Sequence, residues 1–405
     1  MKRNTFFTVL VLIALFAVNN TIFAQENEEE STGIRPDAPS YAIRGPYAVG
    51  TMEMVVDNDE RPLPFTIWYP ALNPDNLEQA HTYVMNYPGA LVGLEALGHA
   101  LFEADPNPAD GPYPLFIYAH GFGGVRAGYI AFMEQLASRG FVAIAADHVG
   151  TTIAVDLSSP DAVWPALYTV PQDFSLLIDY ADVLNSNGLL KSMIDTERVA
   201  VGGHSAGGFS SLIAAGGLLE LNYLADECAN GAQLNDCEFF VPYLQEIAES
   251  LGLDAPPEGL WPSVRDERID AVIPMAPDQV LFGTEGLGQV SVPSLYFVGS
   301  GDQLIPPDVY NTWFPTLGSE TAYMVELENA SHSIYVNSCD TIPMMVDWGA
   351  FGVCADPVWD RNRAHDVIDH YLTAFLLWQL NGDEDAAKIF EAGAERFPGV
   401  NVINK

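Results

Sequence analysis

The sequence predicts an α/β fold with a mostly parallel, eight-stranded sheet and helices on both of its faces. Two observations lead to this prediction. Short runs rich in β-branched and aromatic residues alternate with amphipathic runs along most of the chain, and this alternation is typical of a parallel sheet covered on both sides. The stretch Val199–Gly217 (VAVGGHSAGGFSSLIAAGG) then joins one such strand to one such helix through a glycine-rich turn.

The expected elements follow each other in a regular order. The first two strands are joined by the turn-rich DNDERP and should form an antiparallel hairpin. Asn73–Pro112 is an expected insertion near one end of the sheet, with a short helix around Leu91–Phe102. The expected strands are Tyr47–Val56, Pro64–Tyr69, Leu115–Ala119, Val142–Ala146, Val199–Gly203, Ala271–Met275, Leu295–Val298 and Ala322–Leu327. The expected helices are Ala127–Arg139, Gln172–Ser186, Phe209–Ala215, Val358–Leu380 and Asp383–Arg396.

The first 24 residues are typical of a secretory signal peptide. Lys2 and Arg3 precede the apolar run Phe6–Val18, and the segment ends in small residues at Ala24. The apolar run is short for a membrane span, so an N-terminal anchor is the weaker alternative. Residues 25–40 are then expected to form a disordered, acidic leader, and residues 41–405 one large domain. We therefore expect a secreted protein, extracellular or periplasmic, without a stable membrane anchor.

The charge of the chain excludes one class of partner. Its net charge is −38, from 54 acidic and 16 basic residues. A surface of this sign repels phosphate backbones, so no nucleic-acid partner is expected.

Four cysteines occur as two close pairs. An oxidising compartment favours disulfides between them, and three connectivities are possible. Short loops favour Cys228 with Cys237 and Cys339 with Cys354. A metal site is a weaker alternative because neither pair has C-x-x-C spacing.

A long insertion separates the glycine-rich turn and its helix from the next strand. The connection, about residues 218–270, is far longer than an ordinary one in this architecture. A helical cap stapled by a disulfide and a decorative insertion both fit this length.

Ser205 is the candidate nucleophile. Gly203 and Gly207 flank it at two residues on either side, which gives the motif G-x-S-x-G at a strand-to-helix turn. A turn this sharp leaves no room for side chains beside the serine. A neutral serine hydroxyl is a poor nucleophile, so it needs a base, and the base needs a carboxylate to fix its tautomer.

The candidate base is a histidine downstream of Ser205. Of the three that follow it, His365 and His370 lie in a helical pattern and are expected at the surface, whereas His332 follows a strand in a loop. We therefore expect His332 to be the base. His204, next to the serine, should pack or form hydrogen bonds beneath the turn.

Two aspartates compete for the role of the acid. Asp302 follows a strand that ends in glycines and precedes Pro306 and Pro307, which should open a helix and make a rigid loop. Asp278 follows the strand before it and has no comparable support, so it could equally cap a helix or face the substrate. We expect Asp302 to be the acid.

The loop His120–Gly124 (HGFGG) supplies the other half of the expected site. Glycines after a central strand let backbone N–H groups approach an oxygen closely. The N–H groups of Phe122 and Ala206 are the candidate oxyanion-hole donors. Chemistry of this kind requires no metal and no organic cofactor.

These motifs resemble the α/β-hydrolase superfamily. The combination HGFGG, ADHVGTT, IDTERVAVGGHSAGG, VGSGDQLIPP and ENASH is similar to bacterial proteins described as predicted dienelactone hydrolases, related to platelet-activating-factor acetylhydrolases. The acetylhydrolases take their acid from the region of Asp278. True dienelactone hydrolases use a cysteine nucleophile, and Ser205 departs from that pattern.

The resemblance implies a secreted serine esterase that acts on short-acyl esters or acetylated lipids. Its partners would be small-molecule, lipid or polymer esters. A polyester hydrolase of the cutinase type is an alternative, although such proteins usually lack a cap of this size. A binding protein on an inactive hydrolase fold is another, but Ser205, Asp302, His332 and HGFGG are all present together, which disfavours it.

Overall fold

The structure is a computed structural model. It describes residues 37–405 except 59–60, 88–89, 157–158, 233, 235 and 284. The predicted signal peptide, residues 1–24, lies outside the described residues, and so does the predicted leader up to residue 36.

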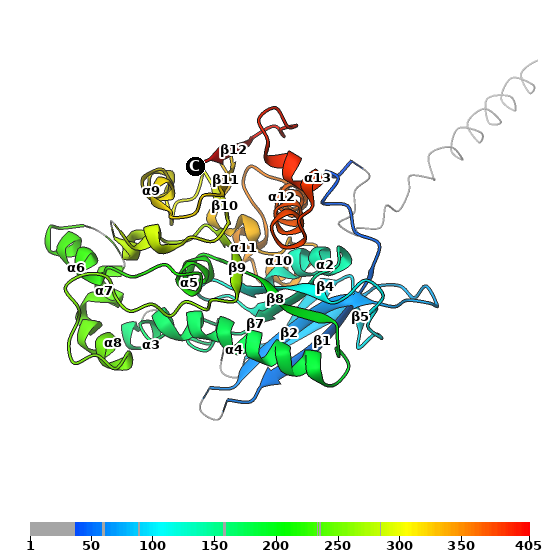
Figure 1. The fold of residues 1–405 in the computed structure, drawn as a ribbon, viewed down its shortest axis with the longest axis horizontal. Helices are drawn as coiled ribbons and strands as arrows, with labels where there is room; N and C mark the ends of the chain where they lie inside the picture. The colour runs from blue at the N-terminus through cyan, green and yellow to red at the C-terminus, as the bar shows by residue number, and fades with distance from the viewer. Residues whose placement is uncertain are drawn as a thin grey trace, which may run out of the picture. The chain divides into compact units, whose positions relative to one another are not determined.

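One large sheet organises residues 37–405. Within the described part, it has ten strands in the order β12-β11-β10-β9-β8-β6-β7-β2-β1-β5 (Figure 1). Strands β6 to β11 run parallel to one another, while β2 and β12 pair antiparallel with the outer two of them, β7 and β11. β1 and β2 form the antiparallel hairpin that the sequence predicts. The bounds are β1 Ala48–Val56, β2 Leu63–Ala71, β5 Leu101–Phe102, β6 Tyr113–Ala119, β7 Val142–Ala146, β8 Ile194–His204, β9 Ile269–Met275, β10 Ser294–Gly299, β11 Ala322–Leu327 and β12 Val400–Asn404.

The sheet is two strands wider than predicted, because β5 and β12 lie at its edges. β5 has two residues, too few to show a period. β12 (VNVIN) is mostly exposed and mixes polar with apolar residues, so its sequence alone is a weak strand signal. It becomes a strand by pairing antiparallel with β11.

Helices cover both faces of the sheet and form two separate cores. α4 (Ala166–Ser186) and α5 (Ala206–Ala214) pack on one face, and α2 (Ile130–Ser138) and α12 (Arg361–Asn381) on the other (Figure 1). Alternate residues of β6 enter different cores, as the pleat of a strand requires: Ile117 joins the first, and Phe116 and Tyr118 join the second. The α/β prediction with both faces covered is therefore confirmed.

The helix expected around Leu91–Phe102 is wrong. This segment forms β4 (Leu91–Gly98), which pairs with β3 (His81–Tyr87) in a separate hairpin, followed by β5. Burial alternates along β4, the period of a strand rather than a helix. The hairpin is held to the body by the Trp68 indole, which donates to the Tyr83 hydroxyl at 2.7 Å.

The helix expected over Asp383–Arg396 is also much shorter. The Asp383 carboxylate caps the turn α13 (Glu384–Ala387), and a 3₁₀ turn at Lys388–Phe390 follows. Gly393, at φ 96°, lies in the left-handed region and does not continue the helix. The remaining short helices are α3 Pro160–Val163, α6 Leu221–Ala229, α7 Asp236–Phe239, α8 Leu244–Ser250, α9 Pro307–Trp313, α10 Met344–Asp347 and α11 Phe351–Cys354.

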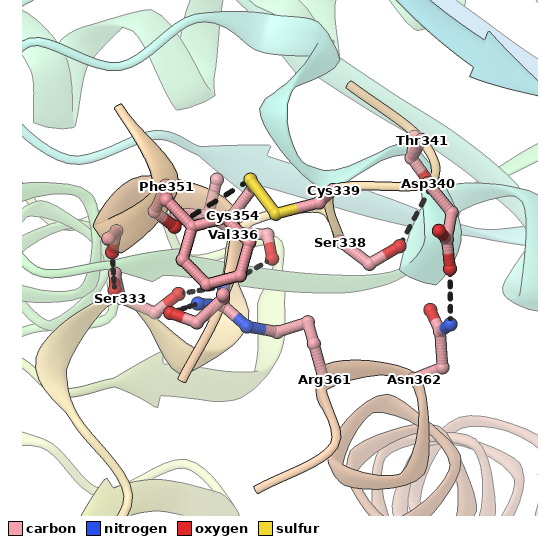
Figure 2. Close-up of a disulfide and its surroundings, with 12 residues drawn as sticks. Ser333, Val336, Ser338, Cys339, Asp340, Thr341, Phe351, Cys354, Arg361 and Asn362 are labelled. Atoms are coloured by element: carbon pink, nitrogen blue, oxygen red, sulfur yellow. Dashed lines mark hydrogen bonds between the residues drawn. A yellow bond between two sulfur atoms is a disulfide. The ribbon is translucent and has the colours of Figure 1, made fainter. Parts of the chain in front are cut away.

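Both expected disulfides are present. Cys228–Cys237 lies in the insertion of residues 218–270, and Cys339–Cys354 closes a ring between η6 (His332–Tyr335) and α12 (Figure 2). The preferred pairing is confirmed. Over the described ranges, no helix is long and apolar enough to cross a membrane.

The packing of α5 against the sheet gives a stability prediction. A Cβ added at Gly207 would lie 2.1 Å from the carbonyl oxygen of Ala119, so Gly207→Ala should lower the free energy of unfolding by roughly 1–3 kcal/mol or more. At Gly128 the nearest atom would lie 3.9 Å away, and Gly128→Ala should change it by less than about 0.5 kcal/mol. Thermal or urea unfolding of both variants measures this, and equal stability would contradict the close approach.

Candidate active site

Ser205 occupies the sharp turn between β8 and α5. Its φ of 55° and ψ of −119° are unusual for a residue with a side chain, and the surrounding backbone enforces them. The Ser205 N–H donates to the Met275 carbonyl at 2.8 Å, which anchors the turn to β9. A Cβ at Gly203 would lie 2.4 Å from the carbonyl carbon of Gly207, so the turn has the close backbone approach that the motif predicts.

His332 and Asp302 come together from neighbouring strand ends. Asp302 follows β10, His332 follows β11, and the imidazole Nδ1 lies 2.7 Å from the carboxylate Oδ2. The other Asp302 oxygen accepts the N–H groups of Leu304 and Ile305 at 2.8 and 2.9 Å. The Asp302 carboxylate is buried and held on both oxygens, so the orientation of the His332 ring is fixed.

Asp278 has a different partner. Its carboxyl group forms a hydrogen bond with that of Asp236, which comes from α7 in the 218–270 insertion. Burial, and then the nearby Asp278, raise the pKa of Asp236 to about 8. Burial also raises the pKa of Asp278, and hydrogen bonds from the backbone N–H groups of Val280 and Gln279 oppose that rise. The pair therefore shares a proton at neutral pH, because two adjacent carboxylates cannot both ionise cheaply.

The loop His120–Gly124 approaches the Ser205 turn from β6. A Cβ on Gly121 would lie 3.0 Å from the Cβ of Ser205. The Gly123 N–H donates to Thr151 O at 2.8 Å, and His120 Nδ1 lies 2.8 Å from Gly121 O, so the loop is internally braced. Phe122 and Ala206, the candidate donors, both line the cavity that contains Ser205.

His204 lies beneath the Ser205 turn, as expected. Its Nδ1 lies 2.9 Å from the Tyr129 hydroxyl, and its Nε2 lies 2.9 Å from the carbonyl oxygen of His332. Burial, and then the neighbouring His332, hold its pKa well below the ordinary value, so the ring stays neutral and can act both as donor and acceptor.

The expectation that His365 and His370 lie at the surface is wrong. Both are buried, because α12 packs on the sheet and α2 on one side and on the segment after α13 on the other. His365 Nε2 lies 3.1 Å from Ile334 O, and His370 Nδ1 accepts the Tyr41 N–H at 3.3 Å. Burial lowers the pKa of His370 to about 4.

A cavity of about 770 Å³ surrounds Ser205 and His332. On one side the wall is formed mainly by α4 and the insertion, whose lining residues belong to or pack against the core on the α4 and α5 face. On the other it comes from the β3–β4 hairpin and the ring closed by Cys339–Cys354, with residues of the second core. The two walls are lined by Leu167, Leu234, Phe239, Phe240 and Leu281, and by Met85, Leu94, Val336, Ile342 and Met345.

In the part of the chain that the structure describes, the Asp, Glu, Lys and Arg side chains that line this cavity are all acidic. Asp236, Asp278 and Asp308 line it, and among its described lining residues there is no lysine or arginine. No cluster of three or more His, Cys, Asp or Glu side chains in the described ranges is arranged to hold a metal ion. The cavity is therefore an apolar space with Ser205, His332 and a few carboxyl groups at its surface.

Sequence reasoning missed Asp236 as a member of the site. Its position next to Cys237 was the available signal, because the disulfide restrains the segment that brings it to the cavity. It also missed Tyr129, whose contact with His204 depends on tertiary packing alone.

Two sequence families match parts of the chain. The profile of platelet-activating factor acetylhydrolase, isoform II, matches residues 34–159, and that of the alpha/beta hydrolase family matches residues 116–342. The platelet-activating factor acetylhydrolase of Gallus gallus is 27% identical over 124 residues, 26% of this chain and 29% of that protein. The chain thus matches less than a third of that relative's length.

Solved structures also match the fold. The ferulic acid esterase from Streptomyces cinnamoneus has a TM-score of 0.58 and 20% identity, over 92% of this chain and 99% of that chain. At this identity, the match supports the fold alone. The match to the alpha/beta hydrolase family covers more than half of the 405 residues and includes Ser205, Asp302 and His332, so the chain belongs to that family.

Proposed function

We propose that the protein is a serine carboxylic ester hydrolase in which Ser205 is the nucleophile, His332 the base and Asp302 the acid. The observation that carries this proposal is the 2.7 Å contact between His332 Nδ1 and Asp302 Oδ2, in a cavity that also contains Ser205 on a strained turn. A nucleophile, a base and a group that orients the base are the parts that such chemistry needs.

The contact supports a definite tautomer. With Nδ1–H donating to Asp302, Nε2 is left to take the proton of Ser205 as the hydroxyl attacks the ester carbonyl. The N–H groups of Phe122 and Ala206 would stabilise the oxyanion of the tetrahedral intermediate, with each donor contributing on the order of 3 kcal/mol. His332 then protonates the leaving alcohol. Water, activated by the same histidine, hydrolyses the acyl-enzyme and returns the free serine.

The cavity supports a neutral ester as substrate. Its walls are apolar, and the carboxyl groups that line it would repel a negatively charged substrate. We infer short-acyl esters or acetylated lipids, in line with the names of the acetylhydrolase relative and of the esterase of similar fold. Two disulfides fit an oxidising compartment, which supports a secreted location.

We also propose that residues 218–270 form a cap on the cavity. Phe239 and Phe240 from this insertion line one wall, and Asp236 joins the cap to Asp278 beside β9. A cap with these contacts would exclude water from the bound ester.

Loss of the nucleophile gives the first test. Ser205→Ala should lower kcat for p-nitrophenyl acetate by a factor on the order of 10⁵ to 10⁶, because the nucleophile, base and acid act as one unit and loss of the hydroxyl disables it. A serine-directed phosphonate should label the native protein and not the variant. Folded Ser205→Ala protein with near-normal turnover would reject the assignment, and a native protein that neither turns over nor is labelled would favour a binding protein.

Comparison of the two aspartates tests the acid. Asp302→Asn should lower kcat by roughly 10⁴-fold, because an amide cannot hold His332 in the required tautomer. Asp278→Asn should lower it by about tenfold at most, since its carboxyl group pairs with Asp236. Steady-state kinetics on the same substrate decide between them, and the reverse ranking would assign the acid to Asp278.

The carboxyl pair predicts a dependence of stability on pH. The folded state holds a proton at Asp236 up to about pH 8, and the unfolded state loses it near the ordinary value of 3.8. The contribution of the pair to the free energy of unfolding is therefore full below pH 3.8, falls as pH rises towards 8, and is level above that. Urea unfolding from pH 5 to 9 should show this fall in the native protein and less of it in Asp236→Asn. Glu238→Gln, an exposed neighbour in α7, is the control, and equal slopes in all three would contradict the shared proton.

A further inference from the structure

The loop that carries His332 has little regular structure of its own. It leaves β11, forms the single 3₁₀ turn η6, and enters the ring that is closed by Cys339 and Cys354. One turn of 3₁₀ helix does not fix a backbone by itself, so the groups around the loop must hold it. Side chains from other parts of the chain hold the loop in place.

Arg361 makes the most hydrogen bonds of these side chains. Its side chain is buried, and its guanidinium donates to the carbonyl oxygens of Ser333, of Val336 at 2.7 Å and of Ala355 at 2.8 Å. Figure 2 shows the guanidinium beside the disulfide, between the segment after His332 and the segment after Cys354. One cation thus joins the segment that precedes the disulfide ring to the segment that follows it.

Asp356 and His204 hold the other end of the loop. The Asp356 carboxylate accepts the N–H of Ser331 at 2.8 Å and the Ser331 hydroxyl at 2.7 Å. His204 contacts the carbonyl oxygen of His332 itself. The backbone on either side of His332 is therefore bound to side chains. On its C-terminal side Arg361 supplies two of these contacts, and His365 contacts Ile334 O between them.

The chemistry of Arg361 suits a clamp. Burial lowers its pKa to about 10, so the group is still charged at neutral pH, and its bonds to the carbonyl oxygens are charge-assisted. Its Cα belongs to the first turn of α12, a 21-residue helix packed against the sheet, which gives the clamp a rigid base. Its Nη1 donates to the segment after His332 and its Nη2 to the segment after Cys354, and lysine, with a single terminal nitrogen, has no such fork.

We propose that Arg361 is a positioning residue for the ester hydrolysis: it fixes the loop of His332 against the ring closed by Cys339–Cys354, and so sets the imidazole relative to Ser205. The inference rests on the proposed function, since it takes His332 as the base. The disulfide is the covalent part of the same device, because Ala355, which accepts a bond from Arg361, directly follows Cys354.

The clamp predicts a loss in kcat rather than in substrate binding. Arg361→Ala should lower kcat for p-nitrophenyl acetate by about 10- to 100-fold, the effect expected for a shift of about 1 Å in a catalytic group, with KM within about twofold. Guanidinium ion at a non-denaturing concentration should restore part of kcat by filling the vacated site. Arg363→Ala is the matched control, because Arg363 lies on the same helix, is half-buried and pairs with Asp37 and Asp366. It should keep native kcat and receive no rescue.

Two further variants keep the proposal testable if Arg361→Ala does not fold. Arg361→Lys retains the charge without the fork and should lower kcat in the same way. The double variant Cys339→Ser, Cys354→Ser should also lower kcat more than it raises KM. Native kcat in any folded variant of this set, or a loss that guanidinium does not reverse in folded Arg361→Ala, would overturn the inference. Failure of the proposed function is distinguishable, since it would leave the native protein without turnover or phosphonate labelling.

Discussion

The close approach of two glycines around Ser205 is the constraint on which the rest of the site depends. The strand β8 can turn into α5 at a single residue only because no side chain stands between Gly203, Gly207 and the end of β6. This turn places Ser205 at the carboxyl edge of the sheet, where the loops that follow β6, β10 and β11 begin. The strained φ of Ser205 is tolerated because α5 is packed on β6, β8 and β9, and its first turn cannot relax.

The loops around this turn are held by different means. Two backbone N–H groups hold the carboxylate of Asp302. A disulfide and the buried guanidinium of Arg361 hold the segment after His332. A shared proton joins Asp236 of the insertion to Asp278 beside β9. These contacts are all between side chains and loop backbone, or between loops. The sheet provides the edge at which the loops meet, and the loops provide the shape of the cavity.

The sequence was informative wherever local pattern decides structure. The eight central strands, the turn at Ser205 and the disulfide pairs follow from short β-branched and aromatic runs, glycine spacing and short loops, and the structure has them all. Strand ends in a parallel sheet converge, so Ser205, Asp302 and His332 could be expected around one cavity, and they do lie close to it. Their roles are the proposal made above.

What the sequence could not show depends on contacts between distant segments. β12 is a strand because β11 offers it an edge. β4 was mistaken for a helix because two of its exposed residues, Val92 and Leu97, are apolar, so the sequence does not show the alternation of burial. The buried positions of His365 and His370 depend on what covers both sides of α12. Arg361 and Asp236 look like surface charges in the sequence, and only the fold gives them buried partners.

The division of the cavity between two cores bears on how such a protein can change its substrates during evolution. Leu281 and Phe240 on one wall belong to a different hydrophobic core from Leu94 and Ile342 on the other. Substitutions on opposite walls share few neighbours, so their effects on stability should add independently, whereas substitutions within one wall should couple. Selection for a new ester could therefore remodel one half of the cavity while the other half, and the turn at Ser205, stay unaltered.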